Sequence, residues 1–283
     1  MKTIVRASSF RLISSIGLGV VLLTAMPVMA DTTLFFDDFN GPALNPAWQA
    51  SLPNANIAYP IFGNPRSATY LGAPNYSFQT LGGYSVLHMT NNMNNFQRVG
   101  WSSSTAFNPA AFTYEARFNT LTQSSSSSID SFIELWILDP TNPNHYDMVS
   151  LFGASYSTDL RFAVGSSIDN TFGSQAFNYQ NNTWYRLVIQ DLPGQNIRVS
   201  LDNDSGTELI GQTLSHTEGA YGSGFEIALS QAMGYPQTTC PSDVAVDYAR
   251  LTAVPEPGCV VLTVTGLFWL GVTGKRRSAK IKS

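Results

Sequence analysis

Short runs of aromatic and β-branched residues recur along the middle of the chain, and almost none of this region repeats with the periodicity of an amphipathic helix. Clusters of Asn, Gly, Pro and Ser separate the runs, so the pattern predicts β-strands joined by turns. The predicted strands are Leu34–Phe39, Val86–Thr90, Gln97–Ser102, Thr113–Phe118, Ile129–Leu138, Asp147–Phe152, Leu160–Val164, Trp184–Gln190, Ile197–Asp202, Leu209–Leu214, Phe225–Ser230 and Val244–Thr252. The Asn- and Pro-rich stretch between residues 50 and 83 is predicted to form loops. So many short strands are typical of an all-β fold, a jelly-roll sandwich of two antiparallel sheets.

The first thirty residues follow a different pattern. They comprise a basic start (Lys2, Arg6 and Arg11), an apolar run (Leu12–Thr24) and a small-x-small cleavage site (Val28-Met29-Ala30). This order is that of a secretory signal peptide, whose apolar part forms a helix. We therefore predict that residues 1–30 are a signal peptide and that the exported chain begins at Asp31.

The last thirty residues hold a second apolar segment. They comprise Pro255, Glu256 and Pro257, an apolar run from Gly258 to Gly274, and a basic end that begins with Lys275, Arg276 and Arg277. A helix over the apolar run would be about 26 Å long, at the short end of what crosses a bilayer. Because basic residues stay on the cytoplasmic side, the preceding domain is predicted to lie outside the cytoplasm.

This order of motif, transmembrane helix and basic end resembles the PEP-CTERM sorting signal of Gram-negative bacteria. The resemblance covers residues 253–283. It implies that exosortase, a membrane peptidase, processes the tail, which is in the membrane before processing. It also implies a location at the cell surface or in the extracellular matrix. An ordinary C-terminal membrane anchor is the alternative.

The region between the two ends, residues 31–252, has an acidic and lysine-free composition. Seven arginines stand against eighteen acidic residues, an excess of eleven negative charges. Such a domain lacks the basic surface that phosphates require, so nucleic acid is not an expected partner. An acidic extracellular domain does suit a divalent cation such as calcium. The sequence contains no P-loop, dinucleotide-binding, zinc-binding or Gly-x-Ser-x-Gly motif.

Three strings in this region occur in an informative order. They are Phe35-Phe36-Asp37-Asp38-Phe39-Asn40-Gly41 with Leu44-Asn45-Pro46-Ala47-Trp48 after it, Asn182-Thr183-Trp184-Tyr185-Arg186-Leu187 with Ile197-Arg198-Val199-Ser200-Leu201-Asp202, and Val244-Ala245-Val246-Asp247-Tyr248-Ala249-Arg250-Leu251. They resemble the opening, a later hairpin and the closing strand of concanavalin A-like lectin/glucanase domains. The resemblance implies that the closing strand pairs with the first.

The segment Ile129–Leu138 carries the most suggestive chemistry. Side chains alternate between the two faces of a strand, so Ile133, Leu135 and Ile137 are predicted to face the core. The opposite face then carries Asp130, Phe132, Glu134 and Trp136. Aromatic rings that stack on sugars, next to carboxylates that bond to hydroxyls, form the combination that a carbohydrate site uses. These four residues are our candidate site for polysaccharide.

Laminarinase-type glycoside hydrolases, which share the suspected fold, place a Glu-x-Asp-x-Glu pattern on such a strand. Here Ser128 stands where the first Glu is expected, and Glu134 follows Asp130 by four residues. Four residues of regular strand span about 13 Å, whereas retaining hydrolysis needs carboxyls about 5–5.5 Å apart. A second carboxylate from a neighbouring strand would restore a hydrolase, and Glu115 and Asp147 are the residues to inspect.

Asp247 is a second candidate, for metal. In several members of the suspected fold, the Asp before an aromatic residue on the closing strand binds a structural calcium. Asp247-Tyr248 matches that position, and Asp38 lies on the first strand. The alternative is a surface Asp that hydrogen-bonds to the first strand.

The sequence therefore predicts an exported domain with three possible roles. The first is binding of extracellular polysaccharide without catalysis. The second is a glycoside hydrolase with a degenerate acid motif, and the third is a structural matrix protein without a ligand.

Overall fold

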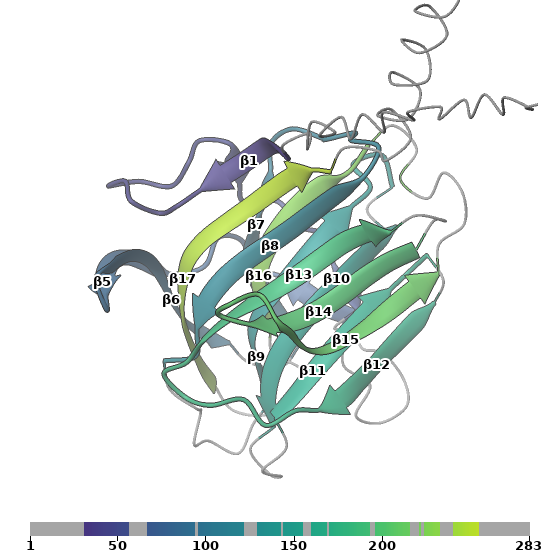
Figure 1. Cartoon of the computed structure of the whole chain (residues 1–283). Coiled ribbons are helices and arrows are strands. Elements are labelled where there is room, and N and C mark those ends of the chain that lie inside the picture. Colours follow the sequence, from purple (N-terminus) through teal and green to yellow (C-terminus); the bar gives the residue numbers. More distant parts are fainter. Residues whose placement is uncertain are drawn as a thin grey trace, which may run out of the picture.

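The computed structural model describes residues 31–56, 67–93, 96–121, 129–142, 144–154, 160–168, 170–192, 196–215, 221, 224–232 and 240–254. These residues form two β-sheets that pack face to face (Figure 1). The described part of the chain contains no helix, and therefore none that could cross a membrane. The predicted signal peptide and sorting tail lie outside the described residues.

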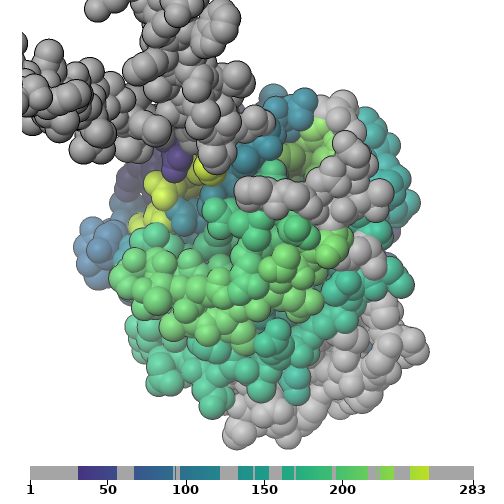
Figure 2. Space-filling view, turned by 45° about the vertical axis from the view of Figure 1, so that its right-hand side comes forward, coloured from purple at the N-terminus to yellow at the C-terminus, as the bar shows by residue number. Residues whose placement is uncertain are grey.

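One sheet has eight strands. They are β1 (Thr32–Asp37), β5 (Tyr76–Leu81), β6 (Tyr84–Met93), β8 (Phe112–Asn119), β13 (Trp184–Leu192), β14 (Asn196–Asn203), β15 (Glu208–Ser215) and β17 (Cys240–Ala253). Their order is β15-β14-β13-β8-β17-β6-β5, and β1 pairs with β17. The first and last strands of the sandwich therefore lie side by side, as predicted, and both reach the surface (Figure 2).

The other sheet has nine strands. They are β2 (Trp48–Gln49), β3 (Ala55–Asn56), β4 (Ser67–Tyr70), β7 (Gln97–Ser103), β9 (Ile129–Leu138), β10 (Tyr146–Ala154), β11 (Leu160–Ser166), β12 (Thr171–Ala176) and β16 (Glu226–Ala232). Their order is β12-β11-β10-β9-β16-β7-β4-β3, with β2 paired to β7. All described pairings are antiparallel except that of β4 with β7.

The main core lies between the two sheets. Leu135 and Leu229 from the nine-stranded sheet pack with Tyr114, Leu187 and other apolar residues of the eight-stranded sheet, all fully buried. This arrangement follows from the alternation of side chains along each strand. All the described strands and both large core clusters lie between Thr32 and Ala253, so residues 31–254 include every described element of the sandwich and its core.

The sequence predicted the strands well but not their full number. Each of the twelve predicted strands is present, and the strand predicted at 129–138 has the bounds of β9. Five others were missed, namely β2, β3, β4, β5 and β12. Three of these lie in the stretch predicted to be loops, where Asn, Pro and Gly interrupt any two-residue alternation.

Candidate functional site

The strand β9 has the two faces that the sequence predicted. Ile133, Leu135 and Ile137 point into the main core, while Glu134 and Trp136 point to the other side of the nine-stranded sheet. The backbone of β9 is irregular at Phe132, because Ile133 pairs with Leu151 and Ser131 with the next residue, Phe152. The side chains of Asp130 and Phe132 lie outside the described part of the structure.

Glu134 is held by an arginine that the sequence analysis did not single out. The Nε of Arg98 donates to Glu134 Oε2 at 2.9 Å, and its Nη2 donates to Oε1 at 3.4 Å. Ser230 Oγ also donates to Oε2 at 2.7 Å and accepts the indole N–H of Trp136 at 2.9 Å. The guanidinium carbon of Arg98 lies 4.2 Å from the centre of the Trp136 ring. We call these four residues the inner cluster.

The inner cluster is closed to solvent. Arg98, Glu134, Trp136 and Ser230 are each 0% exposed. Arg98 Nη1 donates to the carbonyl oxygen of Ala55 at 3.0 Å, so the backbone at β3 covers the guanidinium. This corrects our expectation of an open sheet face, because a carboxylate and a ring that are fully buried cannot contact a sugar in this conformation.

A glycoside hydrolase needs two carboxylates close together. Among the described residues, Glu134 has no such partner. Asp147 points to the opposite side of its sheet and accepts a hydrogen bond from the hydroxyl of Tyr221. Glu115 lies on β8, in the other sheet. Glu226, which the sequence analysis did not consider, shares the face of Glu134, and burial raises its pKa. It pairs with Leu138, four residues from Glu134, which is about 13 Å along the strand.

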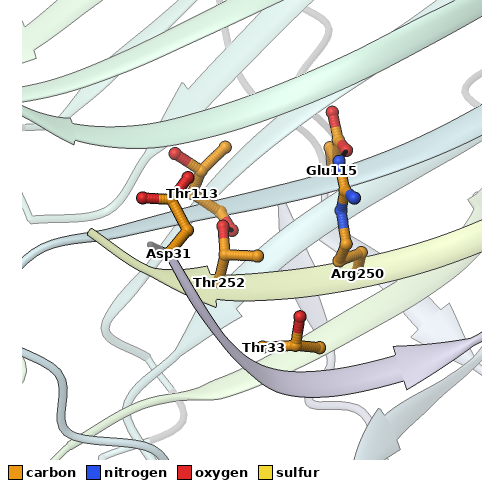
Figure 3. Close-up of a pocket in the computed structure, with 6 residues that line it drawn as sticks. All are labelled: Asp31, Thr33, Thr113, Glu115, Arg250 and Thr252. Atoms are coloured by element: carbon orange, nitrogen blue, oxygen red, sulfur yellow. Dashed lines mark hydrogen bonds and ion pairs between the residues drawn. The ribbon is translucent and has the colours of Figure 1, made fainter. Parts of the chain in front are cut away.

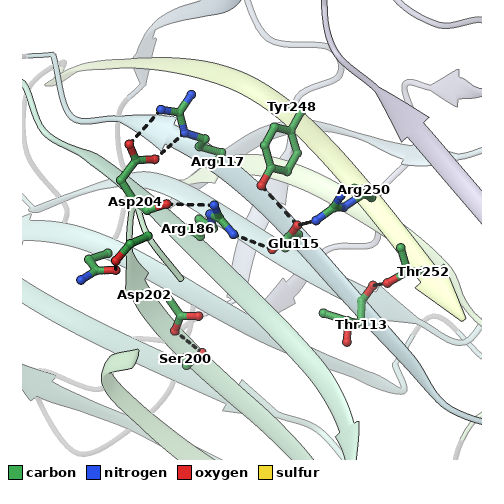
Figure 4. A network of polar contacts seen from close by, with 12 residues as sticks. Thr113, Glu115, Arg117, Arg186, Ser200, Asp202, Asp204, Tyr248, Arg250 and Thr252 are labelled. Carbon is green, nitrogen blue, oxygen red and sulfur yellow. Dashed lines mark hydrogen bonds and ion pairs between the residues drawn. The ribbon is translucent and has the colours of Figure 1, made fainter. Parts of the chain in front are cut away.

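The outer face of the eight-stranded sheet has a second arginine cluster, of which Figure 4 shows Arg117 and Asp204. Arg117 donates through Nε and Nη2 to the two carboxylate oxygens of Asp204, at 2.6 and 3.1 Å, and through Nη1 to Asp247 at 2.6 Å. Its guanidinium carbon lies 4.3 Å from the Trp184 ring centre and 4.5 Å from that of Tyr84. We call these five residues the outer cluster.

Ion pairing shifts the pKa values of the outer cluster. The hydrogen bond from Arg117 lowers the pKa of Asp204. Burial alone would lower the pKa of Arg117, but its hydrogen bonds and charge interactions with Asp204 and Asp247 outweigh that and raise it. Arg117 and Asp204 are therefore both charged across the neutral range.

Glu115 connects the outer cluster to the last strand, β17. Arg250 and the Tyr248 hydroxyl both donate to its Oε1, and Arg186 lies 3.9 Å from Oε2 (Figure 4). Burial, with the nearby charge of Glu115, raises the pKa of Tyr248 to about 12. Glu115 is thus a structural acid on the sheet that does not carry Glu134.

The two residues predicted to bind calcium are engaged with protein groups. Asp247 accepts from Arg117, and Asp38 accepts from the backbone and side chain of Asn40. Within the described ranges, no three acidic, histidine or cysteine side chains gather in a metal-binding group. The calcium site at Asp38 and Asp247 therefore stays a prediction, and in this structure Arg117 is the partner of Asp247.

A polar pocket of about 240 Å³ opens beside Glu115, as Figure 3 shows. It is lined by Asp31, Thr33, Thr113, Glu115, Arg250 and Thr252. The residues come from β1, β8 and β17, where Thr33 pairs with Thr252 and Thr252 pairs with Thr113. The pairing thus brings three hydroxyl side chains into one row across the outer face.

Arg98 and the pocket had only weak signals in the sequence. Arg98 stands in the otherwise uncharged strand 97–103, and a buried arginine requires an acidic partner. Glu134, inside an aliphatic strand, was the matching acid. No comparable signal marks the pocket, because its threonines are ordinary strand residues until three strands are placed side by side.

Solved structures share the fold of this chain. The CBM2 module of the evolved Dit protein of Lactobacillus casei BL23 phage J-1 is 15% identical, with a TM-score of 0.55, over 79% of this chain and 96% of that one. An endo-1,3-β-glucanase from Streptomyces sioyaensis is 19% identical, with a TM-score of 0.54, over 81% and 99%. A glycoside hydrolase family 16 endo-glucanase from Bacteroides ovatus is 16% identical, with a TM-score of 0.50, over 77% and 99%.

These similarities establish the concanavalin A-like jelly-roll sandwich that the sequence resembled. At such low identity they show the fold alone. No protein-family model and no curated protein matches the sequence.

Proposed function

We propose that this chain is an exported protein that binds extracellular polysaccharide without hydrolysing it. The inner cluster is the observation that argues against hydrolysis. Arg98 and Ser230 donate hydrogen bonds to the carboxylate of Glu134, and this carboxylate is closed to solvent. Glycoside hydrolysis needs an acid and a second carboxylate that both face the sugar. On this face the described residues place Glu226 about 13 Å along the strand from the enclosed Glu134, which is too far for a catalytic pair.

Support for a polysaccharide ligand comes from the fold and from the predicted ends. Two of the similar structures are glucanases by name and one is a CBM2 module, although a shared fold is only an analogy for function. The signal peptide and the Pro255-Glu256-Pro257 tail, if processed by exosortase, would deliver the domain to the cell surface or matrix of a Gram-negative bacterium, where polysaccharide is abundant.

One observation favours a hydrolase as the second candidate. Glu226 lies on the same face as Glu134 and has a raised pKa, as general acids often do. Hydrolysis would require the cover over Glu134 to move and a partner acid to approach from elsewhere. A matrix protein without a ligand is the third candidate.

The test uses purified residues 31–254 with laminarin, mixed-linkage β-glucan, dextran and alginate. Affinity electrophoresis measures binding, and a reducing-end assay on the same mixtures measures hydrolysis. We expect retardation by at least one polysaccharide and no reducing ends above the blank after a day. Release of reducing ends that Glu226→Gln abolishes would establish the hydrolase instead. Absence of binding and hydrolysis would favour the matrix protein.

A further inference from the structure

We propose that the polar pocket between β1, β8 and β17 binds one sugar residue of a neutral polysaccharide, on the outer face of the eight-stranded sheet. This inference rests on the proposed function and gives it a location. The proposed sugar contact is then on the outer face of the eight-stranded sheet, on the opposite side of the sandwich from the buried face of β9.

The pocket offers both hydrogen-bond donors and hydrogen-bond acceptors to a ligand. Asp31 and Thr33 are exposed, and no hydrogen bond joins the side chain of either one to another residue in the described part of the chain. Thr113 adds a hydroxyl that can donate or accept, and Thr252, whose hydroxyl donates to the carbonyl oxygen of Thr113 at 3.4 Å, adds one that can still accept. Sugar hydroxyls need such mixed donors and acceptors, since each of them both donates and accepts.

The charged pair at the back of the pocket is already in place. Arg250 and Tyr248 hold Glu115, which is largely buried, so this carboxylate keeps its position before any ligand arrives. A fixed polar group costs less conformational entropy on binding than a mobile one. The pocket contains the carboxylates of Asp31 and Glu115 against the single guanidinium of Arg250, which favours neutral sugars over anionic ones.

Aromatic surface lies next to the hydrogen-bonding groups. Phe36 is 46% exposed and pairs across β1 and β17 with Arg250, so both side chains lie on the outer face. The Phe36 and Tyr248 ring centres are 6.2 Å apart. An exposed phenylalanine on a polar sheet face costs solvation free energy that a stacked sugar ring would recover.

The size of the pocket limits what it can hold. A cavity of about 240 Å³ is smaller than the roughly 300–1,000 Å³ of drug-sized sites, so it accommodates one sugar ring rather than several. Longer polysaccharide would extend over the exposed Phe36.

The experiment compares variants of residues 31–254 by isothermal titration with laminarin, dextran and alginate. Asp31→Asn/Phe36→Ala removes an exposed charge and an exposed ring, and Thr113→Val separately removes a hydroxyl on another strand. Leu209→Ala is the matched control, because Leu209 is 43% exposed on β15, at the far edge of the same sheet. Thermal unfolding checks that each variant is folded.

We expect the wild-type domain to bind a neutral glucan, the double variant to bind it at least tenfold more weakly, and the control to stay within twofold. Thr113→Val should weaken binding severalfold, and alginate should bind less than the glucans. Wild-type binding that the double variant and Thr113→Val both retain would overturn the pocket while leaving the proposed function intact. If the wild type binds none of the polysaccharides, both fail.

Discussion

The inner and outer clusters use the same chemical unit in two environments. In each, an arginine lies over a tryptophan ring at almost the same distance, 4.2 Å for Arg98 on Trp136 and 4.3 Å for Arg117 on Trp184, and pairs with carboxylate. The side chains of Arg98 and Glu134 are both 0% exposed, whereas Asp204 is 51% exposed. One cluster therefore closes a sheet face, and the other leaves charged groups in contact with solvent.

This difference in solvent exposure suits the two sheet faces to different roles. A buried ion pair must have every partner in place, because the remaining charge is otherwise unsolvated. An exposed pair contributes little to stability, since water screens and solvates it. The face that carries Glu134 is therefore closed by its buried ion pair, whereas on the outer face the carboxylate of Asp204 remains in contact with solvent.

Removal of one partner from the inner cluster should have the largest effect. We expect Arg98→Met to lower the free energy of unfolding by about 3–5 kcal/mol, because Glu134 stays buried without a counter-charge. The double variant Arg98→Met/Glu134→Leu should recover most of this loss. Urea unfolding of residues 31–254 measures both. If the single variant is as stable as the wild type, the inner cluster is not the structural unit described.

The matched change in an exposed pair gives the control for that experiment. Arg198 pairs with Glu208, and their side chains are 29% and 42% exposed. Arg198→Met should cost less than about 1 kcal/mol. Equal losses for Arg98→Met and Arg198→Met would remove the distinction between the two environments.

The two tryptophans provide a second comparison, with a smaller expected difference. Trp136→Ala should cost about 3–5 kcal/mol, because it leaves a cavity in a buried cluster. Trp184 is half-buried, and Trp184→Ala should cost about 1–2 kcal/mol through lost packing and lost contact with Arg117. Thermal unfolding of both variants in one buffer would show the order; the reverse order would contradict the burial described.

Acid should weaken the outer cluster selectively. Since Arg117 lowers the pKa of Asp204, this pair stabilises the fold above the ordinary aspartate pKa of about 4 and loses that contribution as the pH falls through the lower folded value. We expect Asp204→Asn to be slightly less stable than wild type at pH 7, with a difference that shrinks as the pH falls below about 4. A stability difference that does not change between these pH values would contradict the ion pair.

Alkali should produce the smallest of these effects. The Tyr248 hydroxyl has its pKa raised to about 12, so its contribution is complete below pH 10 and is lost as the pH rises to about 12. Tyr248→Phe should flatten the fall in stability over that range. In a pH titration followed by absorbance at 295 nm, the Tyr248→Phe variant should show one fewer high-pKa tyrosine than the wild type. An unchanged profile would mean that the pKa of Tyr248 is not raised.

Strand positions were largely readable from the sequence, because side-chain alternation and turn residues are local signals. The faces of β9 followed from the same alternation, so Glu134 and Trp136 were placed correctly relative to Leu135. What covers that face was not readable. The cover includes Leu52, Ala55 and Ala68, which come from a stretch with no regular pattern and lie far from β9 in sequence.

Partners on different strands of the same sheet were equally hidden. Glu134 and Arg98 are separated by 36 residues, and Arg117 and Asp247 by 130. Such pairs depend on strand order, which a single sequence does not specify. The contact of Asp247 with Arg117 was hidden for the same reason, since the two side chains meet only once β8 and β17 are neighbours.

The most direct test of the account measures polysaccharide binding by the Arg98→Met/Glu134→Leu variant of residues 31–254. This variant removes both charges of the inner cluster and leaves the outer face unchanged. The account predicts a folded domain that binds the same neutral glucan as the wild type, with an affinity within twofold, and releases no reducing ends. A folded variant that has lost binding would show that the face of Glu134 contacts the polysaccharide and would contradict the account.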